Sequence, residues 1–392
     1  MTNDQISTPA DQWATHIHWS RKPGYILIIF ALSLGLCSLT SAQPVQAPYS
    51  SDEVIRDIAK TVAAHRPQVE ARLAKIQGHD SAKATVLYPY DFARVIAEGV
   101  RGYNAADLGI DQQGRPNYYN FGQGVHESDQ VLARLEAGKD PLYQSVGDHE
   151  RHYFNSEANE ILPYRVRTPA GWDGKTPLPM VFILHGDTRN QDFYFERDGQ
   201  TIPKTADKHG FMLVGVFGYH PNGGYNSDML NPNRGGRRGG RGRGFMNGME
   251  PSKISQLSES DTMHVFDIVK KEYPIDPKQI YLFGYSHGGS GAYYIGEKYA
   301  ENWAAIALGG AGNAPSDSYP FDRLKRFNIP VLVYFGDQDS AGVKNNSPAF
   351  VKALNDHAVE ARLKVYPGVN HDGGPSAAAA DAFDFFAAHP RK

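Results

Sequence analysis

The pentapeptide GYSHG at residues 284–288 constrains the fold of this chain more than any other feature of its sequence. Residues 279–283 before it form a short run of apolar, β-branched and aromatic side chains, which predicts a buried strand. Residues 289–299 after it begin with small side chains and continue with apolar positions at helical spacing. Strand, tight turn and helix together predict that Ser286 projects above a sheet, at a helix N-terminus where backbone N–H groups are free. The glycines two positions before and after the serine would let strand and helix approach closely.

A serine hydroxyl is a weak nucleophile that needs a base, and the base needs an acid to orient it. The apolar run at residues 329–335 predicts another buried strand, and the loop that leaves it contains Asp337 and Asp339. We favour Asp339 as the acid because the later carboxylate clears the strand end and can reach across to a neighbouring loop. Asp337 remains the alternative, since a loop aspartate is usually a turn former.

His371 is the candidate base. Residues 361–366 alternate as a strand should, and they lead into a glycine-rich loop that carries His371 just before the last predicted helix. Two other histidines compete with it. His357 belongs to a helical stretch at residues 348–360 and His389 lies in the tail, so both are expected to be solvated.

Ser286, Asp339 and His371 are thereby expected in three loops at the same end of a parallel sheet. Open α/β sheets place their sites at this edge, outside the carboxyl ends of the strands. Such a trio supports nucleophilic catalysis, in which the serine attacks, the histidine takes its proton and the aspartate stabilises the imidazolium.

A fourth element would stabilise the oxyanion of such a reaction. The apolar run at residues 180–184 predicts a strand, and His185 and Gly186 follow it. One expected oxyanion donor is the backbone N–H of His287, directly after the serine, and the other is the N–H of Asp187. Thr188 is the alternative second donor.

With these elements the chain from about Val146 to its end resembles the α/β-hydrolases of the secreted esterase group. That group includes polyhydroxybutyrate-depolymerase-like and feruloyl-esterase-like proteins, and it is related to prolyl-oligopeptidase-like catalytic domains. The resemblance implies the α/β-hydrolase fold, a mostly parallel central sheet flanked by helices, and an ester substrate cleaved without a cofactor. Many of these esterases have a small or polar uncharged residue after His-Gly, where this chain has Asp187.

The N-terminal residues have the pattern of an export signal. Arg21 and Lys22 precede an apolar run at residues 25–39, and small residues follow at a possible cleavage site, which predicts a signal peptide over residues 1–42. The protein would then be secreted or periplasmic. The alternative is an uncleaved membrane anchor, although the run is short for a span. Cys37 is the only cysteine in the chain and lies in this signal, so no disulfide framework is expected.

Between the signal and the hydrolase we expect a helical N-terminal extension over residues 43–145, followed by the catalytic domain over residues 146–392. In the extension, two predicted helices begin near Ser50 and Pro67, and two more occupy residues 90–99 and 128–137. This extension would either cover the active-site mouth or support the domain structurally. Residues 151–167 should form the antiparallel first strands of the sheet.

Two loops are candidates for substrate contact. Tyr219 and Tyr225 belong to a segment that leaves a predicted strand at the catalytic edge, where they could stack on an aromatic acyl group or merely cover the rim. Residues 234–244 form an arginine- and glycine-rich tract. A mobile insertion is the favoured interpretation of this tract, and nucleic-acid binding is the alternative.

Composition excludes several other classes. The formal net charge of −3 indicates no nucleic-acid or membrane-surface partner. No metal-ligand cluster, phosphate-binding loop or dinucleotide fingerprint stands out, so neither metal nor cofactor is expected. The sequence favours an exported serine carboxylesterase acting on a small-molecule or polymeric ester. A prolyl-oligopeptidase-like peptidase and a non-catalytic binding relative that uses the arginine-rich loop are the alternatives.

Overall fold

The computed structural model describes residues 57, 59–98, 121–187, 189–219, 223–230, 249–311 and 319–392. The predicted signal peptide (residues 1–42), Thr188 and the arginine-rich tract (residues 234–244) lie outside the described residues.

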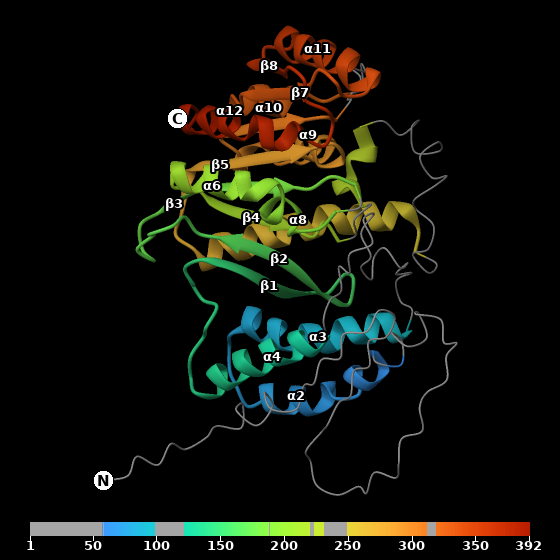
Figure 1. The fold of residues 1–392 in the computed structure, drawn as a ribbon, viewed down its shortest axis with the longest axis vertical. Helices are drawn as coiled ribbons and strands as arrows, with labels where there is room; N and C mark the ends of the chain where they lie inside the picture. The colour runs from blue at the N-terminus through green and yellow to red at the C-terminus, as the bar shows by residue number, and fades with distance from the viewer. Residues whose placement is uncertain are drawn as a thin grey trace, which may run out of the picture. The chain divides into compact units, whose positions relative to one another are not determined.

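One eight-stranded sheet forms the centre of the described chain (Figure 1). Its strands are β1 (Asp148–Asn155), β2 (Glu160–Arg167), β3 (Leu178–Leu184), β4 (Met212–Val216), β5 (Ile275–Tyr285), β6 (Ala305–Gly309), β7 (Val331–Gly336) and β8 (Ala361–Tyr366). Their order across the sheet is β1-β2-β4-β3-β5-β6-β7-β8. The pairs from β4 through β8 are parallel, whereas β1 with β2 and β2 with β4 are antiparallel. The predictions of a mostly parallel sheet and of antiparallel first strands are therefore confirmed.

Burial explains why these segments are strands. Every residue of β4, β6 and β7 is buried, as expected for parallel strands covered on both faces. At the edge, β8 alternates between half-buried and exposed positions over most of its length. The register pairs Leu184 with Gly284, Tyr285 with Gly309, and Gly336 with Tyr366, so five parallel strands end at one edge.

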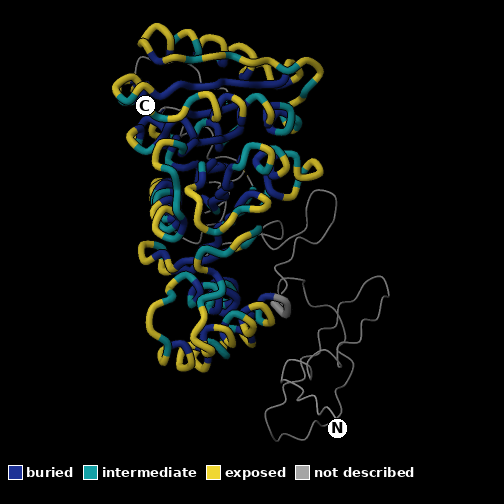
Figure 2. The backbone as a smooth tube through the Cα atoms, turned by 90° about the vertical axis from the view of Figure 1, so that its left-hand side faces the viewer, coloured by how far each residue is buried: buried dark blue, intermediate teal, exposed yellow. Residues whose placement is uncertain are grey.

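Helices cover both faces of the sheet. The described helices are α2 (Arg66–Leu73), α3 (Asp80–Glu98), α4 (Phe121–Glu136), α5 (Phe193–Glu196), α6 (Thr201–His209), α8 (Pro251–Glu272), α9 (His287–Lys298), α10 (Asp322–Phe327), α11 (Ala341–Asp356) and α12 (Gly374–Ala388), with 3₁₀ turns η2 (Asp198–Gln200), η3 (Gly224–Leu230) and η5 (Ala300–Asn302). Alternate side chains of β3 point to opposite faces, so Phe182 packs with α8 and α9, whereas Ile183 packs with α6 and α12. Figure 2 shows the resulting pattern, with buried backbone inside and exposed turns outside.

Helices α2, α3 and α4 form a smaller apolar cluster of their own, and α3 lies along β1 and β2. Two helices begin earlier than the sequence predicted. Helix α3 begins ten residues before the predicted residue 90 because it accommodates Pro89 within its length, and α4 begins before residue 128 despite two glycines in its first turn. Helix α2 begins at Arg66, next to the predicted start at Pro67, and ends at Leu73.

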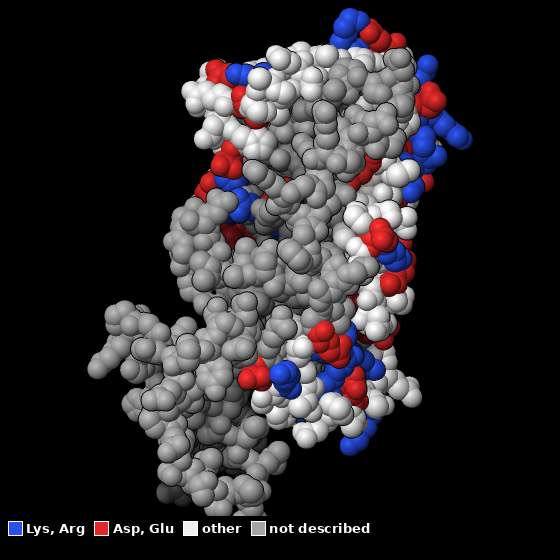
Figure 3. All heavy atoms as spheres, turned by 90° about the vertical axis from the view of Figure 1, so that its right-hand side faces the viewer, with Lys and Arg blue, Asp and Glu red and all other residues white. Residues whose placement is uncertain are grey.

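Charged side chains of both signs are interspersed on the described part of the face in Figure 3. Short ion pairs match this distribution, for example Arg66 with Glu70 at 2.7 Å and Arg362 with Glu360 at 2.7 Å. Exposed pairs of this kind contribute little to stability.

Candidate active site

Ser286 occupies the predicted sharp turn between β5 and α9. Its backbone has φ 59° and ψ −120°, a combination that a residue with a side chain adopts only when its surroundings impose it. Two backbone hydrogen bonds fix the turn. The Ser286 N–H donates to the Gly309 carbonyl at 2.8 Å, and the Ser286 carbonyl accepts from the N–H of Gly289 at 3.0 Å.

The two flanking glycines are required by close backbone approach. A Cβ on Gly284 would lie 2.1 Å from the Gly288 carbonyl oxygen, and a Cβ on Gly288 would lie 2.1 Å from the Leu184 carbonyl oxygen. No side chain fits at such distances. The glycine pattern thus brings β5, α9 and the end of β3 together, as the sequence predicted.

The structure brings Ser286, His371 and Asp339 together in one hydrogen-bonded series. His371 Nε2 lies 3.0 Å from Ser286 Oγ, and His371 Nδ1 lies 2.8 Å from Asp339 Oδ2 and 3.0 Å from Oδ1. A carboxylate only accepts hydrogen bonds, so Nδ1 carries the ring proton and this N–H donates a hydrogen bond to Asp339. Nε2 is then free to accept from the serine hydroxyl, which is the arrangement a general base needs.

Asp337, the alternative acid, faces elsewhere. Its Oδ1 accepts from the Gly368 N–H at 2.7 Å, which ties the loop after β7 to the turn after β8. Asp339 instead contacts the histidine, and its side chain is 1% exposed, whereas the His371 side chain is 42% exposed. The buried carboxylate and the open imidazole leave the reacting side of His371 accessible to a substrate.

The expected oxyanion donors lie beside the serine. His287 is the first residue of α9, where the helix leaves backbone N–H groups unbonded. Gly186 approaches so closely that a Cβ on it would be 3.5 Å from Ser286 Cβ, and Asp187 follows directly. The Asp187 side chain is 60% exposed, and its Oδ1 lies 3.7 Å from His287 Nδ1. The carboxylate that departs from the esterase pattern is therefore largely in solvent, next to an imidazole.

Tyr219 and Tyr225 do not form the exposed aromatic surface predicted for substrate contact. They are 0% and 2% exposed and belong to the main apolar core. The Tyr219 N–H donates to Asp261 at 2.8 Å, and the Tyr225 hydroxyl donates to the His185 carbonyl at 3.2 Å. The prediction was wrong because segment 223–230, which carries Tyr225, folds inward against α8 and α9, and Tyr219 is held to Asp261 of α8.

His185, part of the motif that supports the resemblance, is also buried. Its two ring nitrogens lie 2.8 Å from the carbonyl oxygens of Gly186 and Phe217. Burial lowers its pKa. This histidine therefore connects the loops after β3 and β4, which supports the segment that carries Asp187.

Sequence reasoning missed Tyr285, whose hydroxyl donates to Asp339 Oδ2 at 3.2 Å. As the residue before the serine, it was assigned only to the turn after a buried strand. Nothing in the sequence pattern distinguishes a tyrosine that packs in the core from one that bonds the acid.

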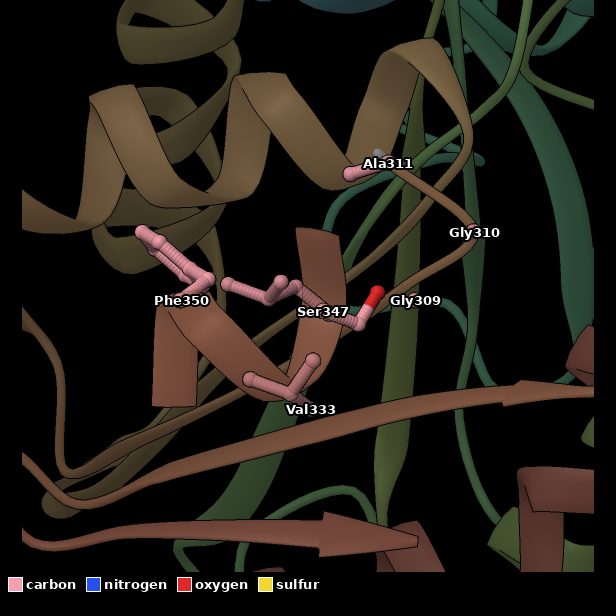
Figure 4. Close-up of a pocket in the computed structure, with 7 residues that line it drawn as sticks. Gly309, Gly310, Ala311, Val333, Ser347 and Phe350 are labelled. Atoms are coloured by element: carbon pink, nitrogen blue, oxygen red, sulfur yellow. The ribbon is translucent and has the colours of Figure 1, made fainter. Parts of the chain in front are cut away.

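A narrow hollow, open to solvent at its mouth, lies beside the end of β6, where Gly309 bonds Ser286 (Figure 4). The lining comes from the end of β6 and the two residues after it, from the middle of β7 and from α11: Leu308, Gly309, Gly310, Ala311, Val333, Ser347 and Phe350. Its interior is too narrow for a water molecule, so we do not assign it to the substrate.

Among the described residues, no group of three or more His, Cys, Asp or Glu side chains is placed to hold a metal ion. In the same part of the chain, no helix has the length and apolarity needed to cross a membrane.

Comparison with known proteins gives one family match. Residues 243–374, which contain Ser286, Asp339 and His371, match the dienelactone hydrolase family. No curated protein sequence matches the chain.

Several solved structures are similar to the chain. The fluorophosphonate-binding serine hydrolase FphF of Staphylococcus aureus is 15% identical, with 62% of this chain and 99% of that chain covered and a TM-score of 0.46. A thermostable esterase is 21% identical, with 62% and 63% covered and a TM-score of 0.46. A ferulic acid esterase of Anaeromyces mucronatus is 17% identical, with 63% and 94% covered and a TM-score of 0.45.

The family match spans the turn after β5 and the loops after β7 and β8. The sheet order, the serine turn and the helices on both faces are those of the fold that the sequence predicted. The chain has the α/β-hydrolase fold, and residues 243–374 match the dienelactone hydrolase family.

Proposed function

We propose that the chain is an exported serine hydrolase that cleaves carboxylic esters through an acyl-enzyme. The observation that carries this proposal is the continuous series from Ser286 Oγ to His371 Nε2 at 3.0 Å and from His371 Nδ1 to Asp339 Oδ2 at 2.8 Å. An accessible imidazole between a strained serine and a buried carboxylate suits acyl transfer.

In the first half of the reaction Ser286 Oγ attacks the ester carbonyl carbon while His371 Nε2 takes the hydroxyl proton. Asp339 holds the resulting imidazolium and balances its charge. The oxyanion accepts hydrogen bonds from the N–H groups of His287 and Asp187, each contributing about 3 kcal/mol of barrier lowering. The bond from carbon to the alcohol oxygen breaks, and His371 returns its proton to the departing alkoxide.

In the second half a water molecule replaces the alcohol. His371 Nε2 removes one proton from this water, whose oxygen attacks the acyl carbon. Collapse of the second oxyanion breaks the bond to Ser286 Oγ, and the proton returns from His371 to the serine. The products are the carboxylic acid and the free enzyme, so no cofactor takes part.

Ser286→Ala tests the nucleophile. Hydrolysis of p-nitrophenyl acetate and butyrate should fall by several orders of magnitude, because no other group replaces the hydroxyl. Ser260→Ala is a matched control, since this half-buried serine on α8 bonds only Glu157 among the described residues. Full hydrolysis by folded Ser286→Ala protein would refute the proposal.

We propose a plant-type phenolic ester or a related polymer as the substrate class. Rates on acetyl, butyryl, feruloyl and hydroxyalkanoate esters, set beside proline-containing peptides, separate an esterase from a prolyl-oligopeptidase-like peptidase. A folded protein that fails to react with a fluorophosphonate probe would instead favour the non-catalytic binding relative.

Export is the final part of the proposal, and it rests on the charged and apolar pattern of residues 21–42. N-terminal sequencing of the protein from the periplasm or the medium tests it. A mature N-terminus near residue 43 is expected, and a full-length chain held in the membrane would overturn it.

A further inference from the structure

Tyr285 contacts two of the three proposed catalytic residues. Its hydroxyl donates to Asp339 Oδ2 at 3.2 Å, the same oxygen that lies 2.8 Å from His371 Nδ1. Its ring lies 5.1 Å from the His371 ring, centroid to centroid, at 47°. One side chain therefore touches both the acid and the base.

The surroundings are shaped to hold this side chain. Tyr285 is 2% exposed, and Tyr334 stacks on its ring with centroids 5.7 Å apart. Two glycines make the space it occupies. A Cβ on Gly310 would lie 2.5 Å from Tyr285 Cζ, and a Cβ on Gly374 would lie 2.2 Å from the hydroxyl oxygen.

Gly310 follows β6 and Gly374 begins α12, so segments from two distant parts of the sequence close around the phenol. Substituting either glycine would displace the hydroxyl or the ring, because the conflicting atoms belong to a side chain packed on all sides. The position of the hydroxyl against Asp339 is therefore set by the fold rather than by a free rotation.

The Tyr285 hydroxyl is always a donor in this setting. Burial raises its pKa, and the charge of Asp339 raises it further, with weaker contributions from Tyr194 and Asp372. The phenol thus keeps its proton across the working pH range and cannot become a competing base.

Asp339 is surrounded by donors. Oδ2 accepts from Tyr285, Oδ1 accepts from the Ser340 N–H at 2.6 Å, and His371 Nδ1 donates between the two oxygens. Without the phenol, the carboxylate has one fewer contact to fix its plane. Only the Ser340 N–H and His371 Nδ1 then hold the carboxylate, which can rotate about its Cβ–Cγ bond.

We propose that Tyr285 is a positioning residue of this site, which fixes the Asp339 carboxylate and the His371 ring in the orientation that activates Ser286. The proposal rests on the esterase function proposed above. Tyr285 is buried, so it acts through Asp339.

Tyr285→Phe tests the proposal with a change of one oxygen atom. We expect kcat for p-nitrophenyl butyrate to fall roughly tenfold, equivalent to about 1.4 kcal/mol, with KM little changed. Tyr281→Phe is the matched control. It lies four residues earlier in β5, and its hydroxyl has no hydrogen-bond partner among the described residues, so its removal should leave kcat unchanged.

The pH profile separates positioning from simple packing. Removing a donor leaves more negative charge on Asp339, which stabilises the His371 imidazolium. The acid limb of kcat/KM should therefore move to higher pH in Tyr285→Phe. A packing defect would not move this limb.

A double-mutant cycle completes the test. In an Asp339→Asn background, Tyr285→Phe should cause no further loss, because the group through which it acts has been replaced. Equal losses in both backgrounds, or an unchanged kcat and acid limb in the single variant, would overturn the proposal. If Ser286→Ala remains active, the esterase function itself fails, and this result is distinct from a silent Tyr285→Phe variant in an enzyme that needs Ser286.

Discussion

Replacing Asp339 by asparagine should abolish most of the activity, and the hydrogen bonds around this residue explain why. The Ser340 N–H, 2.6 Å from Oδ1, can only donate, so the amide oxygen of an asparagine must take the Oδ1 position. The amide NH₂ then takes the Oδ2 position, 2.8 Å from His371 Nδ1 in the native protein.

That geometry reverses the histidine. An NH₂ group donates to Nδ1, which must therefore be unprotonated, and the ring proton moves to Nε2. Nε2 then faces Ser286 Oγ as a donor and cannot accept the serine proton. A triad with the wrong tautomer loses about 10⁴-fold in kcat, or about 5.5 kcal/mol.

Asp337→Asn provides the control from the same loop. Its amide oxygen can still accept from the Gly368 N–H, so activity should stay within about twofold of the native value. Steady-state kinetics on p-nitrophenyl butyrate with both variants measures the difference, and circular dichroism verifies the fold. An Asp339→Asn enzyme with near-native kcat, or an inactive but folded Asp337→Asn enzyme, would refute the reasoning.

Two further predictions concern stability. Asp91 is 2% exposed, pairs with Arg66 and Arg94, and accepts a hydrogen bond from the Ile161 N–H at 2.8 Å. Asp91→Ala should therefore lower the free energy of unfolding by about 3 kcal/mol in urea titrations. A loss below about 1 kcal/mol would contradict the importance of this link between α3 and β2. Gly284→Ala should cost about 3 kcal/mol or more, since its Cβ would meet a backbone carbonyl at 2.1 Å, whereas Gly342→Ala, with nothing within 4 Å, should be neutral or slightly stabilising. Equal melting temperatures for the two glycine variants would be inconsistent with the close approach at the serine turn.

Local sequence signals predicted much of the fold. Each core strand is an apolar run bounded by turn residues, so β3, β5 and β7 were recognisable without any knowledge of their neighbours. The glycine spacing around Ser286 reflects backbone contacts at 2.1 Å, a constraint strong enough to appear directly in the sequence.

Other features depend on packing between distant segments, which local patterns do not report. Tyr219 and Tyr225 follow a strand at the catalytic edge, a position compatible with either the rim or the core, and the inward fold against α8 decides between them. The hydrogen bond from Tyr285 to Asp339 joins residues 54 positions apart. Helix α3 runs through Pro89 because its apolar face packs on β1 and β2, which outweighs the local cost of the proline.

The choice between Asp337 and Asp339 shows how far spacing alone can reach. The argument that a later carboxylate clears the strand end selected the residue that contacts His371. It did not foresee that Asp337 would bind the Gly368 N–H and thereby join the two loops.

The most direct test of the central claim is to find which residue carries the acyl group. The protein is treated with a fluorophosphonate or a slowly hydrolysed ester, digested and analysed by mass spectrometry. We expect one adduct, on the peptide that contains Ser286, and its loss in Ser286→Ala. Labelling of a different residue, or a folded native protein that forms no adduct while it still hydrolyses esters, would contradict Ser286 as the nucleophile.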